Sequence, residues 1–121
     1  MQEQQELQAE IIARWTEVHK KSMVMFLIML ALTEQAMWSK ELQEWLVKVA
    51  NWEVSERGLH RTLKRMNHLD LIEHIEVAVP RTGMKRKDYS LTEFGASTLK
   101  EMKRSSLKYW LEDSFINALE K

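Results

Sequence analysis

The segment SERGLHRTLKRMNHLD, residues 55–70, decides the fold, because it has the pattern of an amphipathic helix whose outer side carries cations. Successive helical residues are about 100° apart, so Leu59, Leu63 and Met66 share one face. Ser55 belongs to the residue types that cap helix N-termini. Hydrogen-bond donors occupy the opposite side and its flanks: Arg57, His60, Arg61, Lys64, Arg65 and His68. The pattern therefore predicts a helix that buries one side and presents donors on the other.

A short β-hairpin is predicted after this helix. Asp70 is expected to end the helix, since aspartate tolerates the left-handed backbone that helix ends often need. Residues 71–79, LIEHIEVAV, alternate apolar and polar side chains as a half-buried strand does. The buried face of this strand is expected to hold Ile75, Val77 and Val79. Residues 88–91, DYSL, predict the returning strand.

The turn between the two strands concentrates positive charge. Residues 80–87, PRTGMKRK, contain the only proline of the chain and a glycine, two residue types that allow a sharp turn. Four cationic side chains lie there: Arg81, Lys85, Arg86 and Lys87. Residues 54–90 hold eight Lys and Arg against five Asp and Glu, whereas residues 1–19 hold one against four. Positive charge is therefore concentrated around the donor-faced helix and the turn.

Three more helices are predicted before residue 55. Residues 3–19 form an amphipathic helix, and residues 21–33, which include the apolar run MVMFLIMLAL, form a buried one. That run has only ten residues and cannot span a bilayer. Ser39 is expected to cap the third helix. The inward side of the third helix is expected to hold Leu42, Leu46 and Val49.

A long final helix is predicted from the cap Thr92 to about Ala118. It carries two apolar stripes, of which one can cover the core of the chain itself. The second stripe needs another partner, and an identical subunit is the simplest one. The expected dimer interface combines residues of the first and last helices: Leu7, Ile11, Trp15, Leu107, Trp110, Leu111 and Phe115.

The length, charge balance and composition of the whole chain limit its possible functions. Its 121 residues are enough for one domain with a core. Cationic and anionic residues balance at 18 each, so any attraction to a polyanion must be local. The chain has no cysteine, which excludes disulfides and thiolate-bound metals and fits a reducing cytoplasm. We expect a single domain of mostly α class with a small β-hairpin.

Two segments resemble the PadR-like family of winged-helix transcriptional regulators. SERGLHRTLKRMNHLDLIEH, residues 55–74, looks like the recognition-helix segment of that family, and KRKDYSLTEFG, residues 85–95, looks like its wing strand and the start of its last helix. The resemblance covers roughly residues 23–103. His60 stands where the family commonly has Tyr, and MWSKEL replaces a typical His-Gly-Tyr segment.

The resemblance implies a winged helix-turn-helix core over residues 21–91. It also implies a C-terminal dimerisation helix over residues 92–119, and the N-terminal helix, residues 3–19, is expected to add to the dimer. The implied function is sequence-specific binding of double-stranded DNA by a cytoplasmic bacterial homodimer. Such a protein is usually a repressor that binds an inverted repeat in a promoter. The recognition helix is then expected to contact DNA through Ser55, Arg57, His60, Arg61, Lys64, Arg65 and His68, and the wing through Arg81, Lys85, Arg86 and Lys87. Arg57 and Arg61 are the best candidates for base contacts, since an arginine can bind guanine with two hydrogen bonds.

Other functions were weighed against this one. A winged-helix module that binds an acidic protein partner, with no DNA, is the main alternative. A small aromatic ligand between Trp15 and Trp110 at the dimer interface is a weaker possibility, because aromatic residues at helical spacing usually pack. The four histidines lack metal-ligand spacing, and no motif indicates an enzyme or a cofactor.

Overall fold

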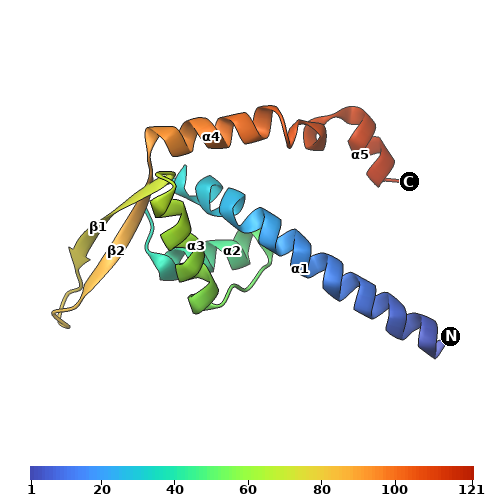
Figure 1. The fold of residues 1–121 in the computed structure, drawn as a ribbon, viewed down its shortest axis with the longest axis horizontal. Helices are drawn as coiled ribbons and strands as arrows, with labels where there is room; N and C mark the ends of the chain where they lie inside the picture. The colour runs from blue at the N-terminus through green and yellow to red at the C-terminus, as the bar shows by residue number, and fades with distance from the viewer.

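The computed structural model describes all residues from Met1 to Lys121 and contains five α-helices, one short 3-10 helix and one hairpin (Figure 1). In chain order these are α1 (Gln2–Leu32), α2 (Ser39–Ala50), α3 (Glu56–His68), β1 (Ile72–Ala78), β2 (Lys85–Leu91), α4 (Glu93–Arg104), η1 (Lys108–Leu111) and α5 (Asp113–Leu119). The prediction of a mostly helical fold with a small hairpin is confirmed.

The core lies where the C-terminal half of α1 meets α2, α3 and the base of the hairpin. The predicted inner face of α3, formed by Leu59, Leu63 and Met66, is completely buried. Other core side chains with no or little exposure come from five elements: Phe26, Ile28, Met29, Leu32, Leu42, Leu46, Ile72, Tyr89 and Leu99. One apolar cluster, from Phe26 to Leu99, therefore joins segments that are up to 73 residues apart in the sequence.

The two predicted N-terminal helices are one helix. The prediction of a break near residue 20 is wrong, since α1 runs without interruption from Gln2 to Leu32. The segment at the predicted break, residues 20–22, is Lys-Lys-Ser and includes neither proline nor glycine. The backbone hydrogen bonds of the helix therefore continue through it. What changes near residue 20 is the burial of the helix. Its first half extends away from the domain, and its second half enters the core (Figure 1).

The start of α2 differs from the prediction by one residue. The N-cap is Trp38, not Ser39, and the backbone N–H of Trp38 donates to Oε1 of Glu41 over 3.2 Å. Leu42 and Leu46 are buried as predicted, but Val49 is 54% exposed. Val49 lies in the last turn of α2, which ends at Ala50, and no other element covers it there.

The hairpin is antiparallel, with Ile72 opposite Leu91 and Ala78 opposite Lys85. Its second strand begins three residues earlier than predicted, at Lys85. The prediction that Ile75 faces the core is wrong, because Ile75 is 68% exposed and Ile72 is the residue of β1 that the core buries. Val77 and Val79 are half-buried. The reason is that residues 72 and 75 lie on opposite faces of a strand, and the face with Ile72 and His74 is the one that meets the domain. Only the base of the hairpin contacts the domain, and the remainder projects from it (Figure 1).

A backbone bridge fixes β2 to the connection between α1 and α2. The N–H of Met37 donates to the carbonyl of Tyr89 over 3.0 Å, and the N–H of Tyr89 donates to the carbonyl of Met37 over 2.8 Å. Both side chains are buried. The hairpin therefore leaves the domain at a fixed position, close to α3.

The predicted long C-terminal helix is interrupted. Thr92 caps α4 as expected, by accepting a hydrogen bond from the N–H of Gly95 over 2.9 Å. The helix then ends at Arg104, and the hydroxyl of Ser105 donates to the carbonyl of Glu101 over 2.7 Å. Serine competes in this way with the backbone hydrogen bonds of a helix. The short helices η1 and α5 follow and change direction (Figure 1).

We predict that Gly95→Ala destabilises the domain by roughly 1–3 kcal/mol, as overpacking of a close contact does. A Cβ atom at Gly95 would overlap the carbonyl oxygen of Leu71, and backbone cannot move aside as a flexible side chain can. The measurement is urea unfolding followed by circular dichroism. Ser97→Ala, at an exposed position of the same helix, is the control and should leave the midpoint almost unchanged. Equal midpoints for the two variants would contradict the packing described for α4.

Candidate nucleic-acid interface

The outer face of α3 is exposed and carries all the donors that the sequence placed there. Ser55 caps the helix by accepting a hydrogen bond from the N–H of Gly58 over 3.0 Å. Asp70 ends this segment with a left-handed backbone, φ 61°, as predicted. Every predicted contact residue of this segment is solvent-exposed: Ser55, Arg57, His60, Arg61, Lys64, Arg65 and His68. Glu56 is the one carboxylate among them, and its Oε1 lies 3.8 Å from Nε2 of His60.

The hairpin tip and the N-terminal end of α3 lie on the same side of the molecule. Figure 1 shows both at the lower edge of the view, whereas α4 runs along the upper edge. The two cationic segments are separated in the sequence by the whole of β1. The fold therefore brings the predicted recognition helix and the predicted wing together on one surface.

A groove of about 350 Å³ separates α3 from the hairpin. We call it the α3–hairpin groove. The helix contributes His60, Lys64 and Asn67, and the hairpin contributes His74 and Lys87. Buried Leu63 and Tyr89 complete the lining, which contains no carboxylate. Lys64 and Lys87, which were predicted for the helix and the wing respectively, thus share one concave surface.

The wing cations do not all have the same surroundings. Arg81 is exposed at the turn, where its backbone has φ 73°, and Gly83 has φ 70°. Lys85 lies 3.7 Å from Oε2 of Glu76 across the hairpin and stays largely exposed. Lys87 is exposed and makes no ion pair. Three of the four predicted cations are therefore available to an external anion.

Arg86 points in another direction. Its Nε lies 3.0 Å from Oδ1 of Asp88, both atoms are buried, and the geometry is that of an ion pair without a good hydrogen bond. The guanidinium group lies 5.0 Å from the ring centre of Trp38, a cation–π distance. Arg86 thus contacts its own chain, beside Trp38 at the start of α2. The sequence could not show this, because the side of a strand on which a residue lies depends on the register.

Two residues that the sequence analysis did not select join the helix to the wing. Nδ1 of His74 lies 3.3 Å from Oδ1 of Asn67, a contact in which the ring nitrogen donates because a carboxamide oxygen only accepts. The His74 ring also packs at 5.7 Å from the ring of Tyr89. Burial raises the pKa of the Tyr89 phenol above its ordinary value. No local sequence pattern predicts these contacts, because they join side chains of separate elements.

The residues predicted for a dimer interface fall into two groups. On α1, Leu7, Ile11 and Trp15 are more than half exposed and contact no other element of the chain. Near the C-terminus, Trp110 packs edge-on against Phe26 at 6.2 Å and, like Leu107, borders the core of its own chain. Leu111 is 86% exposed, and Phe115 packs against Tyr109 at 4.9 Å. The two stripes predicted for a straight helix are therefore not preserved.

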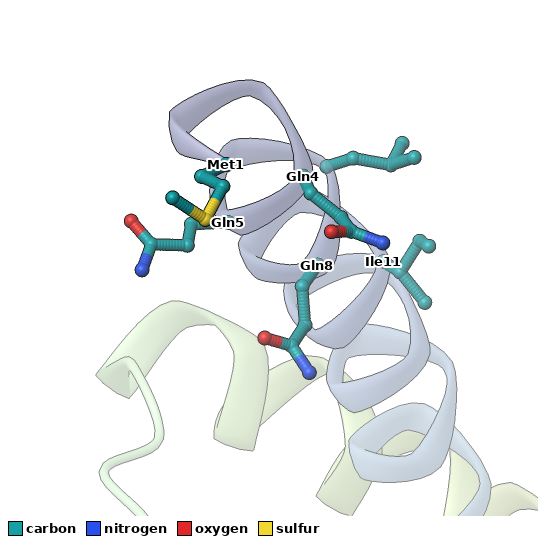
Figure 2. Close-up of a pocket in the computed structure, with 6 residues that line it drawn as sticks. Met1, Gln4, Gln5, Gln8 and Ile11 are labelled. Carbon is teal, nitrogen blue, oxygen red and sulfur yellow. The ribbon is translucent and has the colours of Figure 1, made fainter.

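Other hollows of the surface are less suited to a ligand. One of about 540 Å³ lies along the first turns of α1, where Gln4, Gln8 and Ile11 line it (Figure 2). Its walls come from a single helix, so nothing encloses it. A second, of about 360 Å³, lies between α1, the end of α2 and η1, and includes Trp52 and Trp110. Trp15 is not in its lining and stacks on His19 at 5.1 Å instead.

No three histidine or carboxylate side chains come close enough together to hold a metal ion. None of the helices combines the length and the apolar character needed to cross a bilayer.

No protein-family model and no curated protein matches the chain. Solved structures do match. A PadR-like transcription factor from Bacteroides fragilis is 27% identical, with a TM-score of 0.69, over 88% of this chain and 98% of its own. A PadR-like transcriptional regulator from Bacillus cereus is 28% identical, with a TM-score of 0.67, over 84% of this chain and 95% of its own.

PadR of Bacillus subtilis, solved in complex with operator DNA, is 16% identical, with a TM-score of 0.59, over 64% of this chain and 45% of its own. At that identity the match shows the fold alone. Together, these similarities and the arrangement of α2, α3 and the hairpin show that the chain has a PadR-like winged-helix fold. The resemblance found in the sequence is confirmed.

Proposed function

We propose that the protein is a homodimeric transcriptional regulator, a repressor, that binds an inverted repeat in double-stranded DNA. The observation that carries this proposal is the position of the cations. The outer face of α3 and the tip of the hairpin lie on one side of the molecule, and Lys64 and Lys87 line the same groove. The protein would act in the cytoplasm, on the DNA of the nucleoid.

The dimensions of α3 suit the major groove of DNA, which accepts one α-helix. The exposed donors of its first turns, Arg57 and Arg61, would contact base edges, and an arginine can bind O6 and N7 of guanine together. Lys64 and the free wing cations would contact phosphates. The B. subtilis PadR complex supports DNA binding, because a protein with the same fold was solved with its operator.

A dimer would place two α3 helices in successive major grooves, about 34 Å apart. The exposed apolar residues of α1 support such a dimer. Leu7, Ile11, Ile12, Trp15 and Val18 lie on a helical arm that none of the elements of its own chain covers (Figure 1). A contiguous exposed apolar surface of this kind typically marks an interface.

The alternative function is a winged-helix module whose cations bind an acidic protein. The dependence on salt distinguishes it from DNA binding. For a protein that neutralises several phosphates, the logarithm of the DNA-binding constant falls with the logarithm of salt concentration, by roughly 0.9 per phosphate. A DNA affinity that does not depend on salt, or no DNA binding at low salt, would favour the protein-binding module.

We predict that Lys87→Ala weakens binding to all duplex sequences alike and reduces the slope of this salt dependence by about 1. Lys87 is exposed, faces the groove and is not paired with a carboxylate. The measurement is fluorescence anisotropy over a salt series with a cognate and a scrambled duplex. Lys100→Ala is the matched control, because Lys100 is exposed on α4, at the opposite edge of the molecule. Equal effects of the two substitutions would contradict the assignment of the wing.

We also predict that Ile11→Glu dissociates the dimer, since a carboxylate would have to be buried in an apolar interface. The measurement is sedimentation velocity over a range of protein concentrations. Ala9→Glu adds the same charge about 160° away around α1 and is the control, so it should leave the dimer intact. A dimer that survives Ile11→Glu would show that this face of α1 is not the interface.

A further inference from the structure

The α3–hairpin groove has a lining with one sign of charge. Lys64 and His60 face it from α3, and Lys87 and His74 face it from the hairpin. No carboxylate lines the groove. The carboxylates beside it are Glu56, 3.8 Å from His60, and Glu76, which lies 3.7 Å from Lys85 and opposite Lys87 in the hairpin. An anion in the groove would therefore meet donors from two elements and no carboxylate of the lining.

The size of the groove suits a small anionic group. Its volume of about 350 Å³ corresponds to roughly ten water molecules, each of which occupies about 30 Å³ in the liquid. A phosphate group with part of its hydration shell fits in that space, whereas a folded protein segment does not.

His74 has one ring nitrogen committed and one free. Nδ1 donates to Oδ1 of Asn67 over 3.3 Å, which fixes the ring between α3 and β2, and the ring rests against Tyr89. Nε2 makes no hydrogen bond within the chain. In the neutral ring this nitrogen carries a lone pair, and it becomes a donor only when the ring takes up a second proton.

We infer that the groove binds one phosphate of the DNA backbone, held by Lys64 of α3 together with Lys87 and His74 of the hairpin. This inference rests on the proposed function and adds two residues to it, His74 as a ligand and Asn67 as the residue that positions His74. Because the recognition helix and the wing then bind the same phosphate, the bound strand itself couples their positions.

A proton accompanies this binding. The phosphate oxygen accepts hydrogen bonds, so it pairs with His74 only when Nε2 is protonated, and the proton comes from solvent. The affinity for DNA should therefore rise as the pH falls through the range in which histidines titrate. A charge-assisted hydrogen bond of this kind should raise the affinity for DNA about tenfold.

The test measures the dissociation constant of the full-length protein for one duplex at constant ionic strength, from about pH 8 to about pH 5.5. Wild type should gain about tenfold more affinity over this range than His74→Gln, which keeps an amide donor for Asn67 but cannot titrate. His19→Gln is the matched control. His19 is exposed on α1, outside the α3–hairpin groove and outside the predicted DNA-contact residues, so its substitution should preserve the gain.

A second measurement identifies the phosphate. Duplexes in which a neutral methylphosphonate replaces one phosphate at a time should include a position that removes the His74-dependent gain in wild type. The same replacement should change the affinity of His74→Gln much less. Thermal melting of each variant should show a folded protein throughout.

The outcomes separate the two proposals. Binding without a difference between wild type and His74→Gln in pH dependence would overturn the inference and leave the regulator function intact. The absence of DNA binding at every pH would overturn the proposed function itself. If inorganic phosphate alone saturates the groove, followed through the NMR signals of the His74 ring, while duplex DNA leaves these signals unchanged, the groove binds a free anion and the DNA assignment is wrong.

Discussion

The burial of one face of α3 is the constraint on which the rest of the structure depends. Leu59, Leu63 and Met66 have no exposed surface, and complete burial of such a side chain contributes roughly 1.5–3 kcal/mol. Because helical geometry fixes the angle between residues, burying this face turns Arg57, Arg61 and their neighbours outward. The direction of the cations is thus set by the hydrophobic core. No attraction between charges within the chain is needed to hold them there.

The same core sets the position of the hairpin. Ile72 and Tyr89 are buried beside α3, and the backbone bridge between Tyr89 and Met37 prevents β2 from sliding. Arg86 adds to this anchor through Asp88 and the ring of Trp38. Arg86 therefore helps to position the hairpin. In this position of the hairpin, Lys87 lies opposite Lys64 across the α3–hairpin groove.

Features set by short-range interactions could be predicted from the sequence. The caps at Ser55 and Thr92, the left-handed Asp70 and the buried stripe of α3 each depend on residues within one or two helical turns. They predicted the donor-faced helix and the hairpin in the right order, and the resemblance of residues 55–74 and 85–95 to PadR-like regulators then implied the winged-helix fold. The exposure of the donors on α3 followed directly from the helical period.

Features that depend on distant contacts could not be predicted. The apolar pattern changes near residue 20 because α1 enters the core, and a change in burial resembles a break between helices when only the sequence is read. After residue 104 the spacing of apolar residues in the sequence still fits a helix. In the structure, however, α4 ends before Ser105, and Trp110 packs back against Phe26. The inward direction of Arg86 and the contact between Asn67 and His74 depend on strand register and on packing between elements.

The central claim is that α3 and the hairpin tip contact the same DNA at the same time. The most direct test is acetylation of lysines in the free and the DNA-bound protein, with the modification of each residue quantified by mass spectrometry. The account predicts that DNA protects Lys64, Lys85 and Lys87 together, with the same dependence on DNA concentration, while Lys100 on α4 reacts as before. Protection of α3 without the hairpin, or equal protection of Lys100, would contradict it.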